Sequence, residues 1–317
     1  MSMKRIKWLY TYYSAFICRQ FNKIGIHLTP KFDIPNRPVF DRNFTNEVIT
    51  EYIEHGNPTM IARFGGSETL AAIEEIGISL GCRRHFSKAT FRGITRNAGV
   101  FPQDEKIIRR FSQLLIESGK QIDLLGMWRY PMQDYLINET CPDSVNISRL
   151  RFLEPFSYEK PWTSALRGKK VLVIHPFKKT IEQQYQKREL LFQNQEILPE
   201  FELRVVQAVQ TIAYQKDPRF ADWFEALDYM YMEAMKQDFD VAIIGCGAYG
   251  LPLAAKLKSA GKIAIHLGGV TQILFGIKGS RWDNDNVISK LYNSNWVRPL
   301  EEEMPQNAKI VENGCYW

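Results

Sequence analysis

The sequence predicts an α/β protein with a mostly parallel sheet that is flanked by helices. Short apolar runs recur along the chain, end in glycine and alternate with helical segments. Strands buried in a parallel sheet are continuous apolar runs, and helices usually connect them. The clearest example spans residues 238–282, where a strand expected at 241–244 is followed by a glycine loop, a helix at 251–260 and a strand at 263–267. Such a βαβ unit places its glycine loops at the edge where open α/β sheets bind ligands.

Length and composition describe an ordinary globular chain with room for two lobes. The 317 residues are 45% hydrophobic and 24% charged, and the formal net charge is +6. Dispersed positive charge of this size suits a phosphate-bearing ligand or an anionic membrane surface, but it is weaker than a nucleic-acid-binding protein usually carries. We therefore expect no nucleic-acid partner.

The cysteines and the hydropathy pattern indicate a cytoplasmic protein. The five cysteines are widely spaced and form no CxxC pair, which argues against a zinc site and a disulfide framework. No apolar run approaches the roughly 20 residues of a membrane span, and no cleavable signal peptide is visible.

Residues 1–40 are expected to form an N-terminal amphipathic segment and a linker. Basic side chains flank an aromatic stretch within residues 3–28, a pattern typical of a helix that lies on an anionic leaflet. If the helix binds lipid in this way, the protein is a peripheral protein on the inner face of the cell membrane. A helix that packs its aromatic face on the body fits the pattern equally well. The proline-containing stretch 29–39 predicts the linker.

Residues 41–150 are expected to form a first α/β half, which ends in a linker-like stretch at 138–148. Apolar residues at helical spacing predict helices, and short apolar runs predict strands. The elements expected in this half are helices at 43–55, 69–76 and 104–118 and strands at 60–64 and 122–125.

Residues 151–300 are expected to form a second, Rossmann-like half, and residues 301–317 a loop-like tail. By the same criteria, and besides the βαβ unit described above, the elements expected here are strands at 171–174 and 201–206 and helices at 180–192, 220–236 and 287–292.

A glycine loop follows the first strand of the first half. It consists of Gly65, Gly66, Ser67 and Glu68, and a helix follows at once. Helix capping by Ser67 and the helix dipole acting on Glu68 account for these two residues structurally. Neither effect accounts for Arg63, a cation inside an apolar strand. Because a sugar-phosphate site would use a cation and a carboxylate at such a turn, we favour a ligand site here.

The strand at 171–174 is followed by His175, and Lys178 and Arg188 lie in the polar segment beyond it. A histidine at the carboxyl end of a strand, with cations nearby, is well placed to contact a phosphate or a hydroxyl. A purely structural histidine is an equally good interpretation, and both stay open.

The second glycine loop has the form GxGxxG, with Gly245, Gly247, Tyr249 and Gly250 between a strand and a helix. This spacing is typical of dinucleotide sites, which also use an acid at the end of the next strand. A loop that wraps a phosphate or a sugar is compatible with the spacing alone.

The next strand brings no such acid. It ends in His266, and Gly268 and Gly269 follow. A standard NAD site therefore fits poorly, and an S-adenosylmethionine site lacks the same acid. We expect His266 and the amides of the two glycines to close the ligand site from this strand.

Two stretches resemble a known family. Residues 61–68, IARFGGSE, resemble the RFGDGE signature of the GT-D fold glycosyltransferases, a family first described for a bacterial domain of unknown function. The helix that begins Leu-Pro-Leu-Ala and the strand end AIHLGG are similar to the final βαβ unit of that fold. The resemblance implies a Rossmann-like fold and the transfer of a sugar from a nucleotide-sugar donor, with a UDP-sugar expected. A glycan or lipid-linked glycan would be the acceptor, in bacterial surface-polysaccharide or glycoprotein assembly.

One departure from the family pattern concerns the metal. In the family, an Asp-x-Glu pair serves a divalent cation and the nucleotide diphosphate, whereas here the Asp position is Gly66 and only Glu68 remains. A Mn²⁺ or Mg²⁺ ion is therefore in doubt. Metal-independent transfer, a shifted metal site and loss of activity stay open.

The hypothesis assigns roles to the polar residues of both loops. Arg63, with Lys178 or Arg188, would offset the diphosphate charge, and Glu68 would orient a sugar hydroxyl or act as the base on the acceptor. Two rival functions remain. One is an NAD- or S-adenosylmethionine-dependent enzyme that uses the Gly245 loop, and the other is a non-catalytic nucleotide-sugar or glycan-binding protein of the same fold.

Overall fold

The computed structural model describes residues 2–28, 33–35, 37–215, 217–305 and 307–317. Residues 29–32 and 36 of the expected linker lie outside this range. The described residues form eight strands: β1 (Val39–Phe40), β2 (Thr59–Ala62), β3 (Leu124–Met127), β4 (Asn146–Arg149), β5 (Lys170–His175), β6 (Glu202–Gln207), β7 (Val241–Ile244) and β8 (Ile263–His266).

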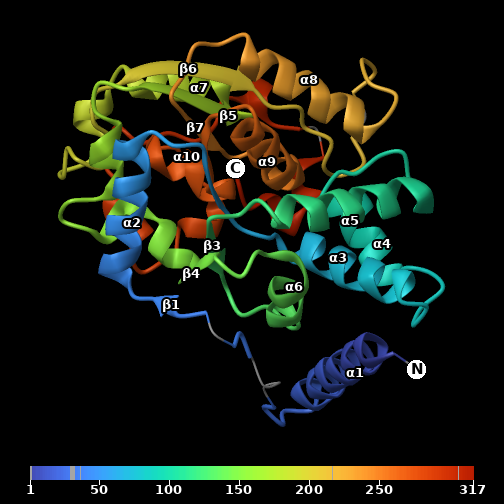
Figure 1. Cartoon of the computed structure of the whole chain (residues 1–317). Helices are drawn as coiled ribbons and strands as arrows, with labels where there is room; N and C mark the ends of the chain where they lie inside the picture. Colours follow the sequence, from blue (N-terminus) through green and yellow to red (C-terminus); the bar gives the residue numbers. More distant parts are fainter. Residues whose placement is uncertain (1, 29–32, 36, 216, 306) are drawn as a thin grey trace.

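All eight strands pair in parallel within one sheet, in the order β1-β4-β3-β2-β8-β7-β5-β6 (Figure 1). The prediction of a parallel α/β sheet flanked by helices is therefore confirmed. The strands of the two expected halves meet at the pair β2–β8, so both halves belong to one continuous sheet.

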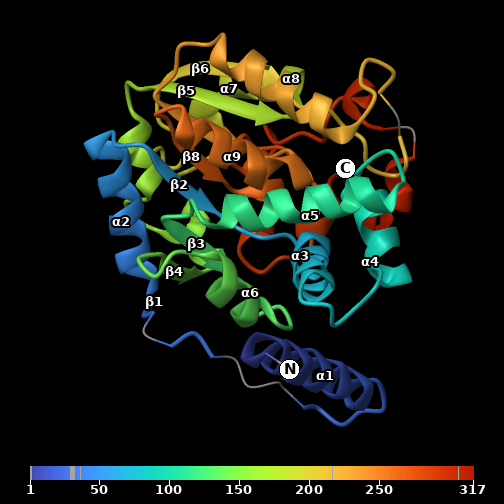
Figure 2. The same cartoon turned by 45° about the vertical axis from the view of Figure 1, so that its right-hand side comes forward.

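Helices cover both faces of this sheet. The α-helices of the described residues are α1 (Met3–Lys23), α2 (Arg42–His55), α3 (Gly66–Ser79), α4 (Lys88–Arg92), α5 (Glu105–Gly119), α6 (Gln133–Thr140), α7 (Lys178–Tyr185), α8 (Trp223–Met235), α9 (Gly250–Ser259) and α10 (Thr271–Leu274). One apolar layer joins the sheet to α3, α5, α6, α8 and α9, and a second joins it to α2, α7 and α10 (Figures 1 and 2).

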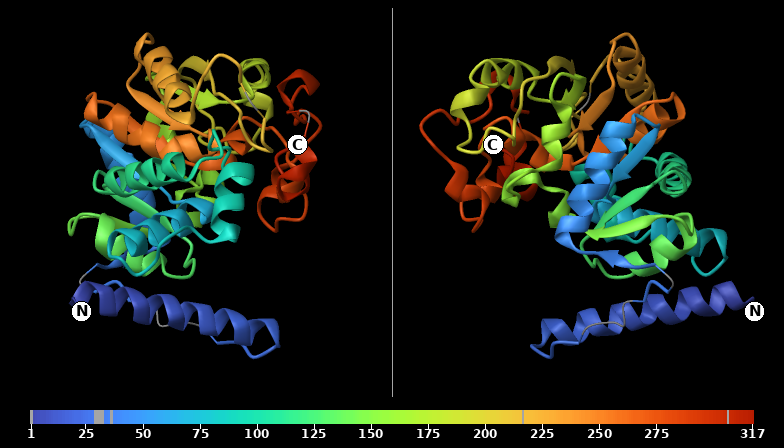
Figure 3. Two further views of the ribbon diagram at one scale, coloured as in Figure 1. Left: turned by 90° about the vertical axis from the view of Figure 1, so that its right-hand side faces the viewer. Right: turned by 60° about the vertical axis from the view of Figure 1, so that its left-hand side comes forward.

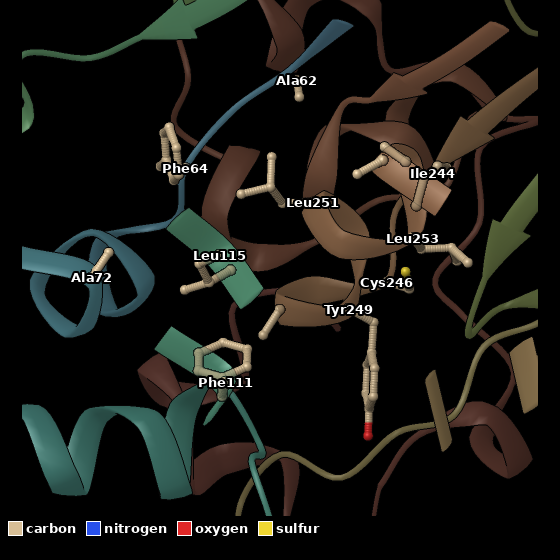
Figure 4. Close-up of a cluster of buried hydrophobic side chains, with 14 of the residues drawn as sticks. Ala62, Phe64, Ala72, Phe111, Leu115, Ile244, Cys246, Tyr249, Leu251 and Leu253 are labelled. Carbon is tan, nitrogen blue, oxygen red and sulfur yellow. The ribbon is translucent and has the colours of Figure 1, made fainter. Parts of the chain in front are cut away.

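The apolar layer beneath α5 and α9 fixes the start of the first glycine loop. Phe64 follows β2 and is fully buried, close to Leu115 and Phe111 of α5 and Leu251 of α9 (Figure 4). Burial of an aromatic side chain of this size is worth roughly 1.5–3 kcal/mol. Phe64 therefore holds the loop in place directly after Arg63.

Two expectations about the first half were wrong. Arg63 lies just beyond β2, which ends at Ala62. The expected linker at 138–148 contains the end of α6 and the internal strand β4. Strand β4 has one buried apolar residue, Ile147, beside the buried Ser148, whose hydroxyl lies 2.7 Å from the Thr45 hydroxyl. A strand stabilised through a buried polar pair shows no apolar run.

Two elements of the second half also differ from expectation. Helix α7 ends at Tyr185, and the chain then turns so that Leu191 and Phe192 become buried. The helix expected at 287–292 is only a 3-10 turn, Ile288–Leu291. The tail at 301–317 packs against the loop after β8, where Tyr316 lies 2.3 Å from the position that a Cβ atom on Gly269 would take.

Candidate functional site

A cavity of about 610 Å³ lies at the carboxyl ends of β2, β5, β7 and β8. Strands β2 and β7 lead to α3 and α9 on one face of the sheet, whereas β5 and β8 lead to α7 and α10 on the other. Loops that diverge in this way leave the crevice in which open α/β sheets bind ligands. The volume falls within the roughly 300–1,000 Å³ of small-molecule sites.

Most of the site residues expected from the sequence line this cavity. They are Arg63, Gly65, Gly66, Ser67, Glu68, His175, Gly245, Gly247, Tyr249, His266, Gly268 and Gly269. The two glycine loops and the strand end of β8 therefore come together around one space.

Lys178, Arg188 and Gly250 do not line the cavity. Lys178 lies in the first turn of α7, with its ammonium 3.9 Å from Glu182. The Arg188 guanidinium forms ion pairs with Glu189 and Glu200. The cations expected to assist Arg63 are thus engaged elsewhere on the surface.

Arg63 extends from the end of β2 across the loop after β8. Its Nη1 atom lies 3.2 Å from the position that a Cβ atom on Gly268 would take, and its guanidinium lies 5.7 Å from the ring centre of Trp128. The Nε–H group is buried and has no hydrogen-bond partner among the described residues. An unsatisfied buried donor costs folding free energy. Arg63 as a whole is half-buried and lines the cavity, so the accessible part of its side chain can meet an anionic ligand.

Glu68 lies in the first turn of α3 and folds back toward the start of the helix. Its carboxylate oxygens lie 2.3 Å from the position that a Cβ atom on Gly65 would take. Gly65 is the N-cap, so Ser67 does not cap the helix as expected. The positive end of the helix dipole favours a carboxylate at this place. Helix stabilisation therefore accounts for Glu68, whose side chain also lines the cavity.

An aromatic pair stands at the side of the cavity next to Gly66. Trp128 is 43% exposed, although indole rings are usually buried. Its ring centre lies 5.2 Å from that of Tyr130, and its Cη2 atom lies 3.2 Å from the position of a Cβ atom on Gly66. The intervening Arg129 has a left-handed φ of 53°, which is costly for a side-chain-bearing residue. Exposed, strained aromatic turns of this kind suit ligand stacking.

Packing explains two glycines of the GxGxxG loop. A Cβ atom on Gly245 would stand 2.6 Å from the His175 ring, and one on Gly250 would stand 2.2 Å from the His266 ring. Gly247 has a φ of 59° and no neighbour within 4 Å of its Cβ position. Only Gly247 is thus left to approach a ligand, which weakens the dinucleotide interpretation of the loop.

Tyr249 points into the protein interior (Figure 4). Its ring stacks on Trp223 at 4.5 Å between centres, and its hydroxyl lies 2.9 Å from that of Thr211. Burial also raises the pKa of the neighbouring Cys246 thiol. A protonated thiol is a poor nucleophile, so these two residues form the floor of the cavity.

His175 and His266 are both buried and neutral. Burial lowers the pKa of each imidazole to about 3, and Arg63 adds to the effect at His266. The amide of Phe177 donates to Nδ1 of His175 at 3.1 Å, which leaves the ring proton on Nε2. His175 can therefore donate a hydrogen bond to a ligand, but neither ring is an effective base at neutral pH.

Glu154 is a lining residue that the sequence did not reveal. It follows the 3-10 turn Leu150–Leu153 after β4, and its side chain is 20% exposed. Burial raises the pKa of its carboxyl group to about 7, against the opposing positive charges of Arg151 and Arg63. A buried carboxyl group that titrates near neutral pH in a cavity is a candidate general base. No sequence motif marks it, because its burial depends on the tertiary fold.

The tail is a second feature missing from the sequence-based site. Val311, Tyr316 and Trp317 line the cavity. Arg281 also lines it, with its guanidinium 4.6 Å from the Tyr316 ring centre. The cations in the lining are therefore Arg63 and Arg281, in place of Lys178 and Arg188.

The lining residues do not fit a resident divalent cation. The part of the chain that the structure describes contains no group of three or more His, Cys, Asp or Glu side chains that could hold one. At the family's Asp position, Trp128 occupies the space into which a side chain on Gly66 would extend. Mg²⁺ and Mn²⁺ prefer carboxylate and water oxygens, which an indole ring cannot supply.

No protein-family model matches the chain, and no curated protein matches it. Two solved structures are similar to it. One is described as the selenomethionine-substituted structure of domain of unknown function 1792, with a TM-score of 0.44, 83% of this chain covered and 94% of the other. The second is described as showing that this highly conserved domain has a distinct glycosyltransferase fold, with a TM-score of 0.41 and coverages of 83% and 96%. Both are 13% identical to this chain, and at these values we draw no functional conclusion from them.

Proposed function

We propose that the protein is a glycosyltransferase that transfers a sugar from a nucleotide-sugar donor, with a UDP-sugar expected, to a glycan or lipid-linked glycan acceptor. Such a reaction would be a step in the assembly of a bacterial surface polysaccharide or glycoprotein. The observation that carries the proposal is the half-buried cation Arg63, which lines a strand-end cavity beside the exposed ring of Trp128.

In this proposal, cations take the place of a metal. Arg63 and Arg281 would bind the diphosphate and stabilise the negative charge that develops as it leaves. Trp128 and Tyr130 would stack against the base or the sugar. The absence of a fitting carboxylate cluster among the described residues favours this metal-independent alternative over a shifted metal site.

Glu154 would act as the general base. An acceptor hydroxyl attacks the anomeric carbon, its proton passes to the Glu154 carboxylate, and the bond from the anomeric carbon to the diphosphate oxygen breaks with its electron pair on the nucleotide. The pKa of Glu154, raised to about 7, suits this task better than the imidazole pKa values of about 3. Glu68 would support the loop and orient a sugar hydroxyl.

A non-catalytic nucleotide-sugar or glycan-binding protein is the second candidate. It is favoured by the position of Glu68, the remaining acid of the family's pair, which folds back over the start of α3. An NAD- or S-adenosylmethionine-dependent enzyme is less well supported, because packing explains Gly245 and Gly250.

Ligand-dependent thermal unfolding tests the proposal. We expect UDP or a UDP-sugar to stabilise the protein with or without Mn²⁺, by about 2.7 kcal/mol at a ligand concentration 100 times Kd. Release of UDP in the presence of an acceptor would then separate the enzyme from the binding protein. Stabilisation by NAD or S-adenosylmethionine, with none from any nucleoside diphosphate, would refute the proposal.

A further inference from the structure

We propose that α1 attaches the protein to an anionic lipid bilayer through the helix face that points away from the body. Figure 3 shows α1 as a straight rod along one side of the molecule, and Figures 1 and 2 place it at the end opposite β6 and α8. This inference concerns where the protein binds, and it does not depend on glycosyl transfer.

One face of α1 packs on α3 and its flanking loop. The side chain of Trp8 is buried, its Nε1–H donates to the Ile73 carbonyl at 3.0 Å, and its ring fills the space above Gly77. Tyr12 stacks on Trp8 at 4.6 Å between ring centres, and its hydroxyl accepts a hydrogen bond from Arg83 at 2.7 Å. These contacts fix the rotation of the helix about its axis.

The opposite face is apolar and exposed. It consists of Met3 (86% exposed), Ile6 (50%), Tyr10 (76%), Tyr13 (57%), Ile17 (50%) and Phe21 (38%). At about 100° per residue, these side chains fall within a sector of roughly 80°, on the side opposite Trp8 and Ala15. No charged residue of the helix falls within that sector. An exposed apolar stripe of this length indicates an interaction surface.

The charges on α1 favour a bilayer over a second protein molecule. The helix has no acidic residue and five basic ones, Lys4, Arg5, Lys7, Arg19 and Lys23. Lys4, Arg19 and Lys23 are exposed and lie outside the apolar sector, whereas Arg5 donates to the Gly81 carbonyl and Lys7 lies 3.6 Å from Glu139. Because anionic lipid attracts basic residues over about a Debye length, the positive charge of the helix adds to the binding of the aromatic and aliphatic side chains. A second copy of the chain would instead bring two sets of like charges together.

The helix is expected to lie in the membrane plane. No helix within the described residues has the length and apolar content needed to cross a bilayer. Tyr and Phe side chains beside Lys and Arg are typical of helices at the interface between headgroups and acyl chains. Because α3 carries Glu68 at its start and Gly77 beneath Trp8, the bound helix would hold the cavity at a fixed orientation to the membrane surface.

Sedimentation of the full-length protein with vesicles tests the inference. We expect binding to vesicles of phosphatidylcholine with phosphatidylglycerol, weaker binding to phosphatidylcholine alone, and a loss of roughly fivefold in affinity when Lys4, Arg19 or Lys23 is neutralised. The double variant Ile6→Glu, Ile17→Glu should bind at least roughly tenfold more weakly, because two charges enter the apolar sector. Both positions are exposed, so thermal unfolding should not change.

The variants Leu190→Glu and Met232→Glu are matched controls, because these residues are 57% and 56% exposed but lie outside α1. They should bind vesicles as the wild type does. Equal vesicle binding by the Ile6, Ile17 double variant would overturn the inference. So would a wild-type dimer in size-exclusion chromatography that the double variant dissociates, if neither protein binds vesicles. Neither measurement involves a nucleotide, so neither result would count against the proposed transferase activity.

Discussion

The imidazole of His266 occupies the space that a side chain on Gly250 would need. The ring Cε1 and Nδ1 atoms lie 2.2 and 2.3 Å from the position of the missing Cβ atom. The first residue of α9 therefore touches the last residue of β8, with no room for a methyl group between them. The last glycine of the GxGxxG pattern thus sets the position of a histidine in the cavity wall.

The variant Gly250→Ala should therefore be destabilised by roughly 1–3 kcal/mol, because overpacking forces His266 or α9 to move. Chemical denaturation would measure the loss. Gly56→Ala is the matched control, since it has a φ of 74° and no neighbour within 4 Å of its Cβ position. It should cost about 1 kcal/mol from backbone strain alone and leave ligand affinity unchanged. Equal ligand affinity in the Gly250 variant would contradict its role in placing His266.

Replacement of Arg63 should abolish ligand binding without unfolding the protein. Arg63→Ala removes a half-buried cation that lines the cavity, so we expect at least a hundredfold loss of nucleoside diphosphate affinity, about 3 kcal/mol. Isothermal titration with UDP measures this directly. Arg188→Ala is the control, because Arg188 is paired with Glu189 and Glu200 outside the cavity. A wild-type UDP affinity in the Arg63 variant would show that the ligand binds elsewhere.

Glu154 should control the pH dependence of turnover. A general base must be ionised, and burial raises the pKa of this carboxyl group to about 7. The rate should therefore rise with pH and level off above about 7, and Glu154→Gln should lower kcat by roughly 10²–10⁴-fold with little effect on KM. A Glu159→Gln variant, at an exposed position, is the control. Retention of the wild-type pH profile in the Glu154 variant would exclude it as the base.

The same carboxyl group should make the protein less stable as the pH rises. The folded-state pKa of about 7 lies above the ordinary value of 4.5, so the folded protein retains the proton longer than the unfolded chain. Stability is then lost between pH 4.5 and 7 and stays low above that range, by up to about 3 kcal/mol. Unfolding free energies at pH 5 and pH 8 should differ less in Glu154→Gln than in the wild type.

Trp128 should contribute to ligand binding and little to folding. Its ring is 43% exposed beside Gly66, whereas Trp223 is fully buried. Trp128→Ala should weaken nucleotide or sugar binding by about 1–3 kcal/mol, the range measured for bases that stack on aromatic rings, and leave the unfolding temperature nearly unchanged. Trp223→Ala should cost roughly 3–5 kcal/mol of stability. A large loss of stability in the Trp128 variant would indicate a structural residue.

The sequence was informative wherever a local pattern determines the structure. Apolar runs located β5, β7 and β8 to within about a residue, because a strand buried on both faces must be apolar throughout. Strand β4 was missed because its buried Ser148 is satisfied by Thr45, a residue 103 positions away. The residues next to a strand in the sequence do not show such a distant partner.

The same limit applies to the site. The lining glycines could be found from the sequence, because glycine turns after strands mark the sheet edge. The sequence did not reveal Glu154, since its environment comes from residues that are distant in the chain. It also placed Lys178 and Arg188 at the site by proximity along the chain, whereas their side chains pair with nearby acids on the surface.

The pairing of β2 with β8 limits how the cavity can close around a ligand. Thr59, Met60 and Ile61 lie opposite Ile263, Ala264 and Ile265 in a parallel ladder that joins the two halves of the sheet. Rotation of one half against the other about a hinge would break this ladder. A closure that moves only loops of the lining, such as residues 209–212, leaves this ladder intact and the relative orientation of the two halves unchanged.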